Sequence, residues 1–173
     1  MDQWFVLYVK STYEDEIAQL INETGRVHAF VPRKVKLHKR QGQIIKINEI
    51  VFKSYVFVET DMDYKTFRVE VLSRIKMHSA YFKTLLHHED KNIETLYPSE
   101  KAFLQSFMND EHVIEESIGV VEGDAVTIVS GPLMGKDSII TKINKHKRVA
   151  YLNVSLMGRD LEIQVPLSFI YKK

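Results

Sequence analysis

GDAVTIVSGPLMGKDSIITKINKHKRVAYLNVSLMGRDLEIQV, residues 123–165, alternates short apolar runs with clusters of turn-forming residues. The runs have the length and the period-2 alternation of β-strands. Closely spaced strands of this kind are typical of a small, strongly bent β-barrel. We predict strands over Ala125–Val129, Ser138–Asn144, Val149–Ser155 and Arg159–Val165, separated by turns at Gly131-Pro132, Lys145–Arg148 and Met157-Gly158.

The preceding part of the chain combines strand and helix patterns. WFVLYVK, residues 4–10, is apolar at successive positions, which predicts a central strand. Ser11 and Glu14 have capping-box spacing and Gly25 is a helix stop, so we predict a helix over residues 14–24. This mixture favours an α+β fold, an antiparallel sheet with packed helices. The other predicted elements are a strand at Val27–Val31, a hairpin of Lys34–Lys39 and Ile44–Val51 around Gln41-Gly42-Gln43, a strand at Tyr55–Glu59, a helix capped by Asp61 or Asp63 with the stripe Phe67, Val71 and Leu72, a mixed segment Ile75–Leu86, and a helix from Pro98 carrying Phe103, Leu104 and Phe107.

Charge divides the chain into three parts. The net charge is +1, yet residues 1–98 carry +2 (15 basic and 13 acidic side chains), and residues 99–118 carry −4 (one basic and five acidic). Residues 119–173 carry +3, from eight basic and five acidic side chains. Two mildly basic parts therefore flank an acidic stretch. We predict a first domain over 1–107, an acidic linker over 108–118, and a barrel domain over 119–173.

Composition excludes several classes of protein. The chain has no cysteine, which excludes disulfides, cysteine-ligated zinc and thiol catalysis. The chain has no run of about 18 apolar residues, the length that a membrane-spanning helix needs, so we expect no membrane span. The first residues lack a basic region followed by a long apolar stretch, so we expect no secretory signal and a cytoplasmic protein.

Two patterns resemble a nucleotide-binding loop and a metal site, but neither has the spacing that such a site requires. In GPLMGKDS, residues 131–138, three residues separate the glycines and Asp137 follows the lysine, whereas a phosphate-binding loop needs four residues and a Ser or Thr. His87-His88-Glu89-Asp90 has adjacent side chains that point in different directions, so we interpret it as a solvated loop. We expect no enzymatic activity, no cofactor and no metal.

The motifs taken together resemble a known family, the NusG-type transcription elongation factors. They are WFVLYVKSTYE from Trp4, VPRKVKLHKR from Val31, FKSYVFVE from Phe52, GDAVTIVSGPLMGKDSIITKI from Gly123 and NVSLMGRDLEIQV from Asn153. The resemblance covers nearly the whole chain in order. It implies an NGN-like amino-terminal domain that binds RNA polymerase and a carboxy-terminal KOW-type five-stranded β-barrel.

The departures from the family pattern indicate a specialised paralogue. The usual Phe-Pro-Gly-Tyr segment is Phe52-Lys53-Ser54-Tyr55 here, and Ser138 replaces the second glycine of the KOW turn. Residues 75–86 have no counterpart to the family's glycine-bearing segment. The chain is most similar to the LoaP antiterminators, whose KOW domain binds a hairpin in nascent RNA.

The resemblance implies a polymerase-binding surface made of Tyr8, Phe52 and Tyr55, which would dock on the clamp helices. Aromatic anchors suit such a contact because they bury a large area with few rotatable bonds. The alternative is that Phe52 and Tyr55 fill the domain's own core.

Basic side chains provide two further candidate surfaces. On the predicted hairpin, Arg33, Lys34, Lys36, His38, Lys39 and Arg40 either contact the backbone of nucleic acid, such as non-template DNA, or keep the hairpin solvated. In the barrel, a tight basic turn suits an RNA hairpin, because bulges and loops admit side chains that a regular A-form groove excludes. The alternative is an ordinary lysine-rich turn. The candidate RNA-binding residues are Lys136, Lys142, Asn144, Lys145, His146, Lys147, Arg148 and Arg159.

Leu156 and Met157 occupy the turn that the general NusG factor uses for ribosomal protein or termination factor. As exposed apolar side chains they would form a protein interface, and as buried ones they would close the end of the barrel.

The resulting expectation is a monomeric antitermination factor that binds RNA polymerase through its first domain and a leader RNA hairpin through its KOW domain. Three alternatives stay open. They are a general elongation factor that uses Leu156 and Met157 on protein partners, a factor recruited by a DNA element, and a ribosome-associated KOW protein.

Overall fold

A computed structural model describes residues 3–172; the side chains of Leu37, Lys39, Arg40, Ile44 and His78 lie outside the description. The chain forms two compact units. Unit 1 consists of Met1–Pro32 and Phe52–Lys101, and unit 2 consists of Arg33–Val51 and Ala102–Lys173. The hairpin between Pro32 and Phe52 thus belongs to unit 2, although the sequence pattern groups it with the first domain. The predicted domain boundaries stay a prediction.

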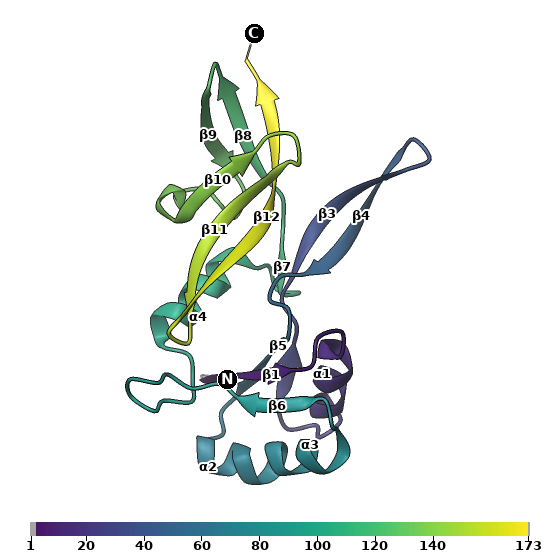
Figure 1. Ribbon diagram of the computed structural model, residues 1–173, viewed down its shortest axis with the longest axis vertical. Helices are drawn as coiled ribbons and strands as arrows, with labels where there is room; N and C mark the ends of the chain where they lie inside the picture. The colour runs from purple at the N-terminus through teal and green to yellow at the C-terminus, as the bar shows by residue number, and fades with distance from the viewer. Residues whose placement is uncertain (1–2, 173) are drawn as a thin grey trace. The chain divides into compact units, whose positions relative to one another are not determined.

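Unit 1 is built on a four-stranded antiparallel sheet with the strand order β2-β5-β1-β6 (Figure 1). The prediction of a central first strand is confirmed, because Trp4, Phe5, Val6 and Leu7 are all buried. The strands are β1 (Gln3–Val9), β2 (His28–Phe30), β5 (Tyr55–Thr60) and β6 (Phe82–Leu85).

Helices cover the face of this sheet that carries Phe5. The ring of Phe5 stacks on Phe67 with centroids 4.3 Å apart, and Ile17 and Ile21 are fully buried. The predicted stripe of Phe67, Val71 and Leu72 is buried as expected. The helices are α1 (Glu14–Asn22) and a continuous run of α2 (Tyr64–Phe67), the π-helical η1 (Arg68–Leu72) and α3 (Ser73–His78).

The two predicted helix starts have different outcomes. Asp63 caps α2, since its carboxylate accepts a hydrogen bond from the Thr66 backbone N–H at 2.7 Å. This hydrogen bond lowers the pKa of Asp63. The predicted capping box before α1 is wrong: the N-cap is Tyr13, which makes no side-chain cap. The physical reason is tertiary, because the Glu14 carboxylate accepts a hydrogen bond from the Ser54 backbone N–H at 2.7 Å.

A helix and two sheets make up most of unit 2. The predicted hairpin is confirmed and turns at Gln41 and Gly42, whose φ angles of 50° and 81° suit a tight two-residue turn. Its strands are β3 (Arg33–Arg40) and β4 (Gln43–Ile50), and β3 also pairs in parallel with β7 (Val113–Ile114). The helix α4 (Pro98–Phe107) begins in unit 1 and ends in unit 2.

The larger sheet of unit 2 is five-stranded and strongly curled, with the strand order β10-β11-β12-β8-β9 (Figure 1). Leu152, Val154, Ile163, Val165 and Leu167 form its buried side. The structure therefore confirms the predicted fold class, an α+β unit followed by a small curled KOW-like sheet. The strands are β8 (Ser117–Glu122), β9 (Ala125–Ser130), β10 (Ile140–Asn144), β11 (Val149–Leu156) and β12 (Arg159–Tyr171), with a short 3-10 turn, η2 (Asp137–Ile139), before β10.

Residues 108–118, predicted as a linker, contain β7 and the first two residues of β8. β8 pairs in parallel with the end of β12, between Ser117–Val121 and Leu167–Tyr171. Within the described residues, no helix has the length and apolar character needed to cross a membrane.

Candidate functional site

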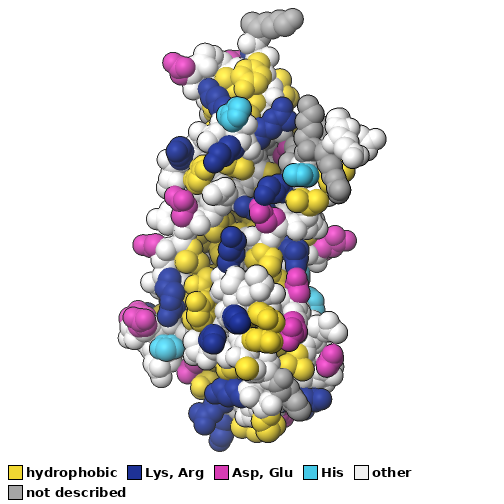
Figure 2. All heavy atoms as spheres, turned by 45° about the vertical axis from the view of Figure 1, so that its right-hand side comes forward, with side chains coloured by type: hydrophobic (Ala, Val, Ile, Leu, Met, Phe, Trp, Pro, Cys, Tyr) yellow, Lys and Arg dark blue, Asp and Glu magenta, His cyan; other side chains and the backbone are white. Residues whose placement is uncertain are grey.

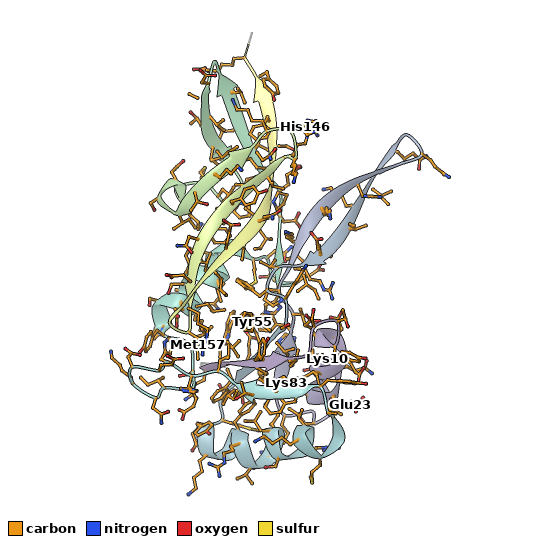
Figure 3. All side chains as sticks on the ribbon, in the orientation of Figure 1. Lys10, Glu23, Tyr55, Lys83, His146 and Met157 are labelled. Atoms are coloured by element: carbon orange, nitrogen blue, oxygen red, sulfur yellow. The ribbon has the colours of Figure 1, made fainter. Side chains whose placement is uncertain are left out.

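Two tyrosines lie together on unit 1, on the sheet face opposite to Phe5. Tyr8 and Tyr55 are direct partners in the β1–β5 register, and their ring centroids are 5.9 Å apart. Tyr8 is 42% exposed and Tyr55 is half-buried. Tyr55 is the first residue of β5 and is labelled in Figure 3. An exposed pair of rings held by adjacent strands is a rigid apolar contact surface.

Phe52, the third predicted anchor, has a different environment. It is only 3% exposed and packs against Phe57, with centroids 5.7 Å apart. In this structure Phe52 therefore fills the core of its own unit, which is the alternative given above for this residue.

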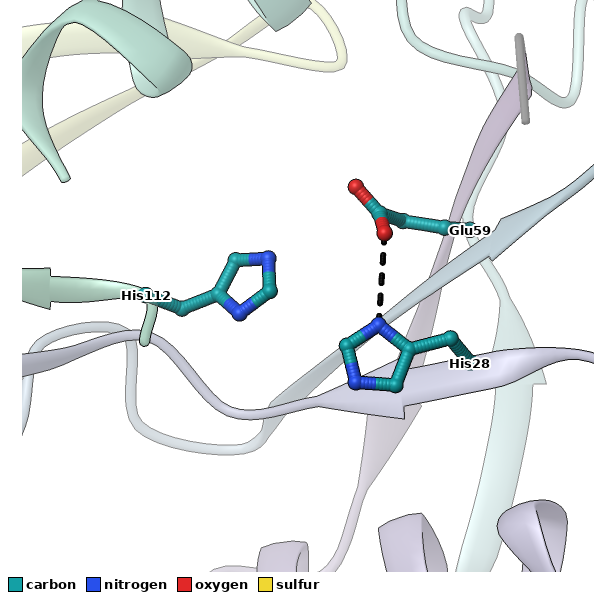
Figure 4. Close-up of side chains that lie close together, drawn as sticks. All are labelled: His28, Glu59 and His112. Carbon is teal, nitrogen blue, oxygen red and sulfur yellow. Dashed lines mark hydrogen bonds and ion pairs between the residues drawn. The ribbon is translucent and has the colours of Figure 1, made fainter. Parts of the chain in front are cut away.

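A hydrogen-bonded pair of side chains, His28 and Glu59, lies at the far end of the same face. Nδ1 of His28 is 3.2 Å from Oε2 of Glu59, and the two residues are partners in the β2–β5 register (Figure 4). His28 also stacks on Phe30, with centroids 5.8 Å apart.

His88 departs from the solvated loop predicted for residues 87–90, in which His87, Glu89 and Asp90 are exposed as expected. Its side chain is 2% exposed and stacks on Tyr97 at 3.8 Å. Nε2 of His88 lies 3.2 Å from Oε2 of Glu100, which also accepts a hydrogen bond from the Tyr97 backbone N–H at 2.8 Å. His88 thus packs in unit 1 beside the start of α4.

In unit 2 the predicted RNA-binding residues concentrate at the turn between β10 and β11. We call Lys145, His146, Lys147 and Arg148 the basic tip. The side-chain oxygen of Asn144 accepts a hydrogen bond from the Lys147 backbone N–H at 2.8 Å, and Arg148 has a φ of 54°. The Arg148 carbonyl in turn accepts a hydrogen bond from the Leu167 N–H on β12 at 3.0 Å. The turn is therefore held in shape at both ends.

Three of the four side chains of the basic tip point into solvent, and Lys145 is half-buried. His146, Lys147 and Arg148 are exposed, and Figure 3 shows His146 at the end of its hairpin. Figure 2 shows Lys, Arg and His side chains close together in this part of unit 2. Lys142 extends the basic surface along β10, where its ammonium lies 5.6 Å from the centre of the Tyr151 ring. Such a surface can contact phosphates and bases together.

Two other predicted RNA-binding residues lie away from the basic tip. Arg159 is at the opposite end of the eight-residue β11, about 25 Å away at the usual rise per strand residue, and donates to the Met157 carbonyl at 3.0 Å. Lys136 donates to the Pro132 carbonyl at 2.9 Å and lies 4.8 Å from the Phe107 ring centre. The sequence pattern therefore groups Lys136 and Arg159 with the basic tip, although the structure places them away from it.

Tyr171 is an aromatic side chain near the basic tip that the sequence analysis did not select. It is 64% exposed at the end of β12 and pairs with Val121, next to the β8–β9 turn. Lys145 reaches the same turn, with Nζ 3.5 Å from the Asp124 carbonyl oxygen. The sequence signal that could have identified it is the run of mostly apolar residues after Pro166, which extends the last strand to Tyr171.

Leu156 and Met157 are each about 1% exposed, so they are buried rather than displayed at their turn. Figure 3 labels Met157 at this turn. Their use as a protein interface stays a prediction.

The basic run on the β3–β4 hairpin is partly neutralised. Lys34 and Lys36 place Nζ 3.6 Å and 3.1 Å from the carboxylate oxygens of Glu49. Burial would raise the pKa of Glu49, but the hydrogen bonds and charges of the two lysines outweigh it and lower the pKa. Lys34 also donates to the Gln164 carbonyl at 2.8 Å. The side chains of Lys39 and Arg40 lie outside the described part, and the nucleic-acid role of Arg33 and its neighbours stays a prediction.

Comparison with known proteins agrees with this architecture. Residues 2–78 match the family model described as "Transcription termination factor nusG". The NusG protein of Helicobacter pylori, named a transcription termination/antitermination protein, is 20% identical over 182 residues that span 99% of both chains. That of Streptococcus pyogenes is 25% identical over 172 residues, covering 95% of this chain and 92% of its own.

The chain is therefore similar to NusG proteins over nearly its whole length. A solved structure, "Domain interaction in Thermotoga maritima NusG", superposes with a TM-score of 0.50 at 17% identity, covering 95% of this chain and 93% of the other. This likeness confirms the predicted NusG fold.

Proposed function

We propose that this chain, which is similar to NusG proteins, is a transcription antitermination and elongation factor with two separate contacts. Unit 1 binds the clamp helices of RNA polymerase, and the basic tip of unit 2 binds a hairpin in the nascent leader RNA. Homology to NusG termination/antitermination proteins supports the general role in transcription, which takes place in the cytoplasm of bacteria. The two contacts rest on the geometry of each unit.

The basic tip is the observation that carries the RNA contact. Its backbone is preorganised by Asn144 and by the Leu167–Arg148 hydrogen bond, so binding does not have to order a flexible loop. Arg148 can donate two hydrogen bonds to a guanine edge, while Lys145 and Lys147 neutralise phosphates. The exposed ring of Tyr171 provides a surface on which an unpaired base can stack.

The pair of Tyr8 and Tyr55 supports the polymerase contact. Two helices that pack against a partner need a flat apolar surface, and the two rings are presented by neighbouring central strands. Once the tip holds RNA, unit 1 searches for polymerase at a high effective concentration, so the RNA element can direct the factor to one operon.

The second candidate is a general NusG-like factor whose KOW domain binds ribosomal or termination-factor proteins. Similarity to NusG proteins along the full chain favours it. The burial of Leu156 and Met157 favours the RNA contact instead, because that turn displays no apolar surface in this structure. The LoaP-like assignment is supported by three sequence departures, at Phe52–Tyr55, at Ser138 and over residues 75–86.

A binding titration of the full chain distinguishes these candidates. Fluorescently labelled leader RNA hairpins and scrambled RNAs of equal length are titrated at one fixed salt concentration. Specific recognition requires a preference for one hairpin of about tenfold or more. An affinity that depends steeply on salt but equally for all RNAs would instead favour the general factor.

Paired variants locate the contact. Lys147→Ala/Arg148→Ala should weaken hairpin binding by about tenfold or more while polymerase binding is unchanged. Lys136→Ala/Arg159→Ala removes the same charge away from the tip and serves as the matched control. Equal loss from the two variants would show that only net charge matters and would contradict the proposal.

A further inference from the structure

Unit 1 has a groove that the proposed polymerase and RNA contacts do not use. It is lined by strand β6 and by the continuous helix of α2, η1 and α3, and its volume is about 450 Å³. The helix packs on the Phe5 side of the sheet, as the Phe5–Phe67 stack shows, whereas Tyr8 and Tyr55 lie on the other side. A ligand in the groove would therefore leave the tyrosine pair accessible.

The helix wall of the groove combines apolar and cationic side chains. Tyr64, Arg68, Leu72 and Lys76 follow one another at intervals of four residues, and all line the groove. A π-helical turn interrupts the helix there: the Ser73 backbone N–H donates to the Arg68 carbonyl, and the Ser73 hydroxyl donates to it at 2.9 Å. Such turns are frequent at functional sites.

The strand wall is an open sheet edge. β6 is the last strand of its sheet, and among the described residues it pairs with β1 alone. The Leu86 N–H donates to the Val6 carbonyl at 2.8 Å, and Leu85 is the next residue in the register, opposite Leu7. Alternation along an antiparallel ladder therefore directs the Leu85 N–H and C=O away from β1, toward the outer edge. The Leu85 carbonyl there accepts a hydrogen bond from the Thr84 hydroxyl at 3.2 Å, which leaves its second lone pair for a partner strand. An exposed edge of this kind is a template for another strand.

The charge in the groove is predominantly positive. Arg68 and Lys76 on the helix and Lys83 on the strand carry positive charges, and Glu94 carries the negative charge among the lining side chains. Lys83 is exposed on β6 (Figure 3), and Lys76 lies 5.8 Å from the centre of the Phe82 ring. The groove is thus complementary to an acidic ligand that also has apolar side chains.

We propose that this groove binds an extended acidic segment of a partner protein, which adds to β6 as a further strand. Its backbone would hydrogen-bond to Leu85. Alternate side chains of the segment would point to opposite faces, so acidic side chains at every second position would all face the groove, which Lys76 and Lys83 line. Strand addition fits the open edge and the positive charge together, whereas nucleic acid would use the cations alone.

The test uses a fluorescein-labelled peptide of alternating valine and glutamate, about eight residues long to span a strand. Anisotropy is measured with the full chain up to about 1 mM protein. The groove variant is Lys76→Glu/Lys83→Glu. The matched control is Lys65→Glu/Arg74→Glu, which makes the same charge change at exposed positions of the same helix outside the groove. We expect saturable binding that weakens about tenfold or more in the groove variant and less than twofold in the control.

Two further probes separate strand addition from charge attraction. A peptide of the same sequence with N-methyl groups on alternate amides cannot pair along one edge, and it should lose binding if β6 provides backbone hydrogen bonds. Single-stranded DNA of the same net charge should bind more weakly than the peptide. Equal binding of the methylated peptide, tighter binding of the DNA, equal loss in both variants, or no binding of the peptide would each overturn the proposal.

Discussion

Tyr8 and Tyr55 are opposite each other on the two central strands of unit 1, with their ring centroids 5.9 Å apart. The strands on which they lie have buried neighbours, Leu7 and Val56, so the backbone beneath the rings is fixed. Side chains that are already ordered lose little entropy when they bind. This relationship makes the pair the strongest candidate for the polymerase contact.

We therefore expect Tyr8→Ala/Tyr55→Ala to weaken polymerase binding by about tenfold or more, as loss of a central aromatic contact does. The measurement is co-sedimentation or surface binding of the full chain with core polymerase. Val69→Ala/Met77→Ala is the control, because these side chains are 65% and 76% exposed on the helix that covers the other side of the sheet. Equal loss in the control, or no loss in the tyrosine variant, would rule out the tyrosine surface.

Asn144→Ala should weaken RNA binding without removing any charge. The substitution removes the oxygen that accepts the 2.8 Å hydrogen bond from the Lys147 backbone N–H. The basic tip of the free variant would then be less ordered, and RNA binding would have to order it. We expect the affinity for a preferred hairpin to fall about three- to tenfold, the equivalent of one hydrogen bond. Asn153→Ala, at an exposed position of β11, is the control. If both variants bind equally, Asn144 has no role in shaping the tip.

Gly131→Ala should destabilise unit 2 far more than Gly135→Ala. Both glycines have a left-handed backbone, with φ of 91° and 74°. A Cβ at residue 131 would lie 2.6 Å from the Ser117 Cα, whereas a Cβ at residue 135 meets nothing within 4 Å. We expect the free energy of unfolding to fall by about 1–2 kcal/mol for Gly135→Ala, because of its backbone conformation alone. For Gly131→Ala we expect it to fall by more than about 3 kcal/mol. Hydrogen exchange of the β8 and β9 amides measures both, and similar protection in the two variants would contradict the close approach.

Asp63→Ala should destabilise unit 1 near neutral pH and have progressively less effect in acid. The folded-state pKa of Asp63 is lowered by the hydrogen bond from Thr66, so the charged carboxylate stabilises the fold above its ordinary pKa of 3.8. That stabilisation is lost as pH falls through the lowered folded pKa. Trp4, the single tryptophan, is buried in unit 1 and reports its unfolding in urea. A difference between wild type and variant that stays constant from pH 7 to about pH 2 would show that the cap does not depend on ionisation.

The sequence by itself determined the features that depend on near neighbours. Alternating apolar residues predicted most of the strands, because side chains in a strand point to alternate faces. Gln41 and Gly42 predicted the hairpin turn, and Asp63 predicted a helix cap, since each conformation is set within a few residues. The order of motifs along the chain was sufficient to identify the NusG resemblance.

Only the tertiary structure decided which side chains are accessible and which are together. Glu14 bonds to Ser54 rather than capping its own helix, and Phe52 is buried against Phe57. The parallel pairing with β12 makes a strand of residues 117–122, whose first two residues read as linker. Arg159 is separated from the basic tip by the length of β11. These outcomes depend on contacts between residues far apart in the chain, and a local pattern carries no information about the partner that buries or binds a given side chain.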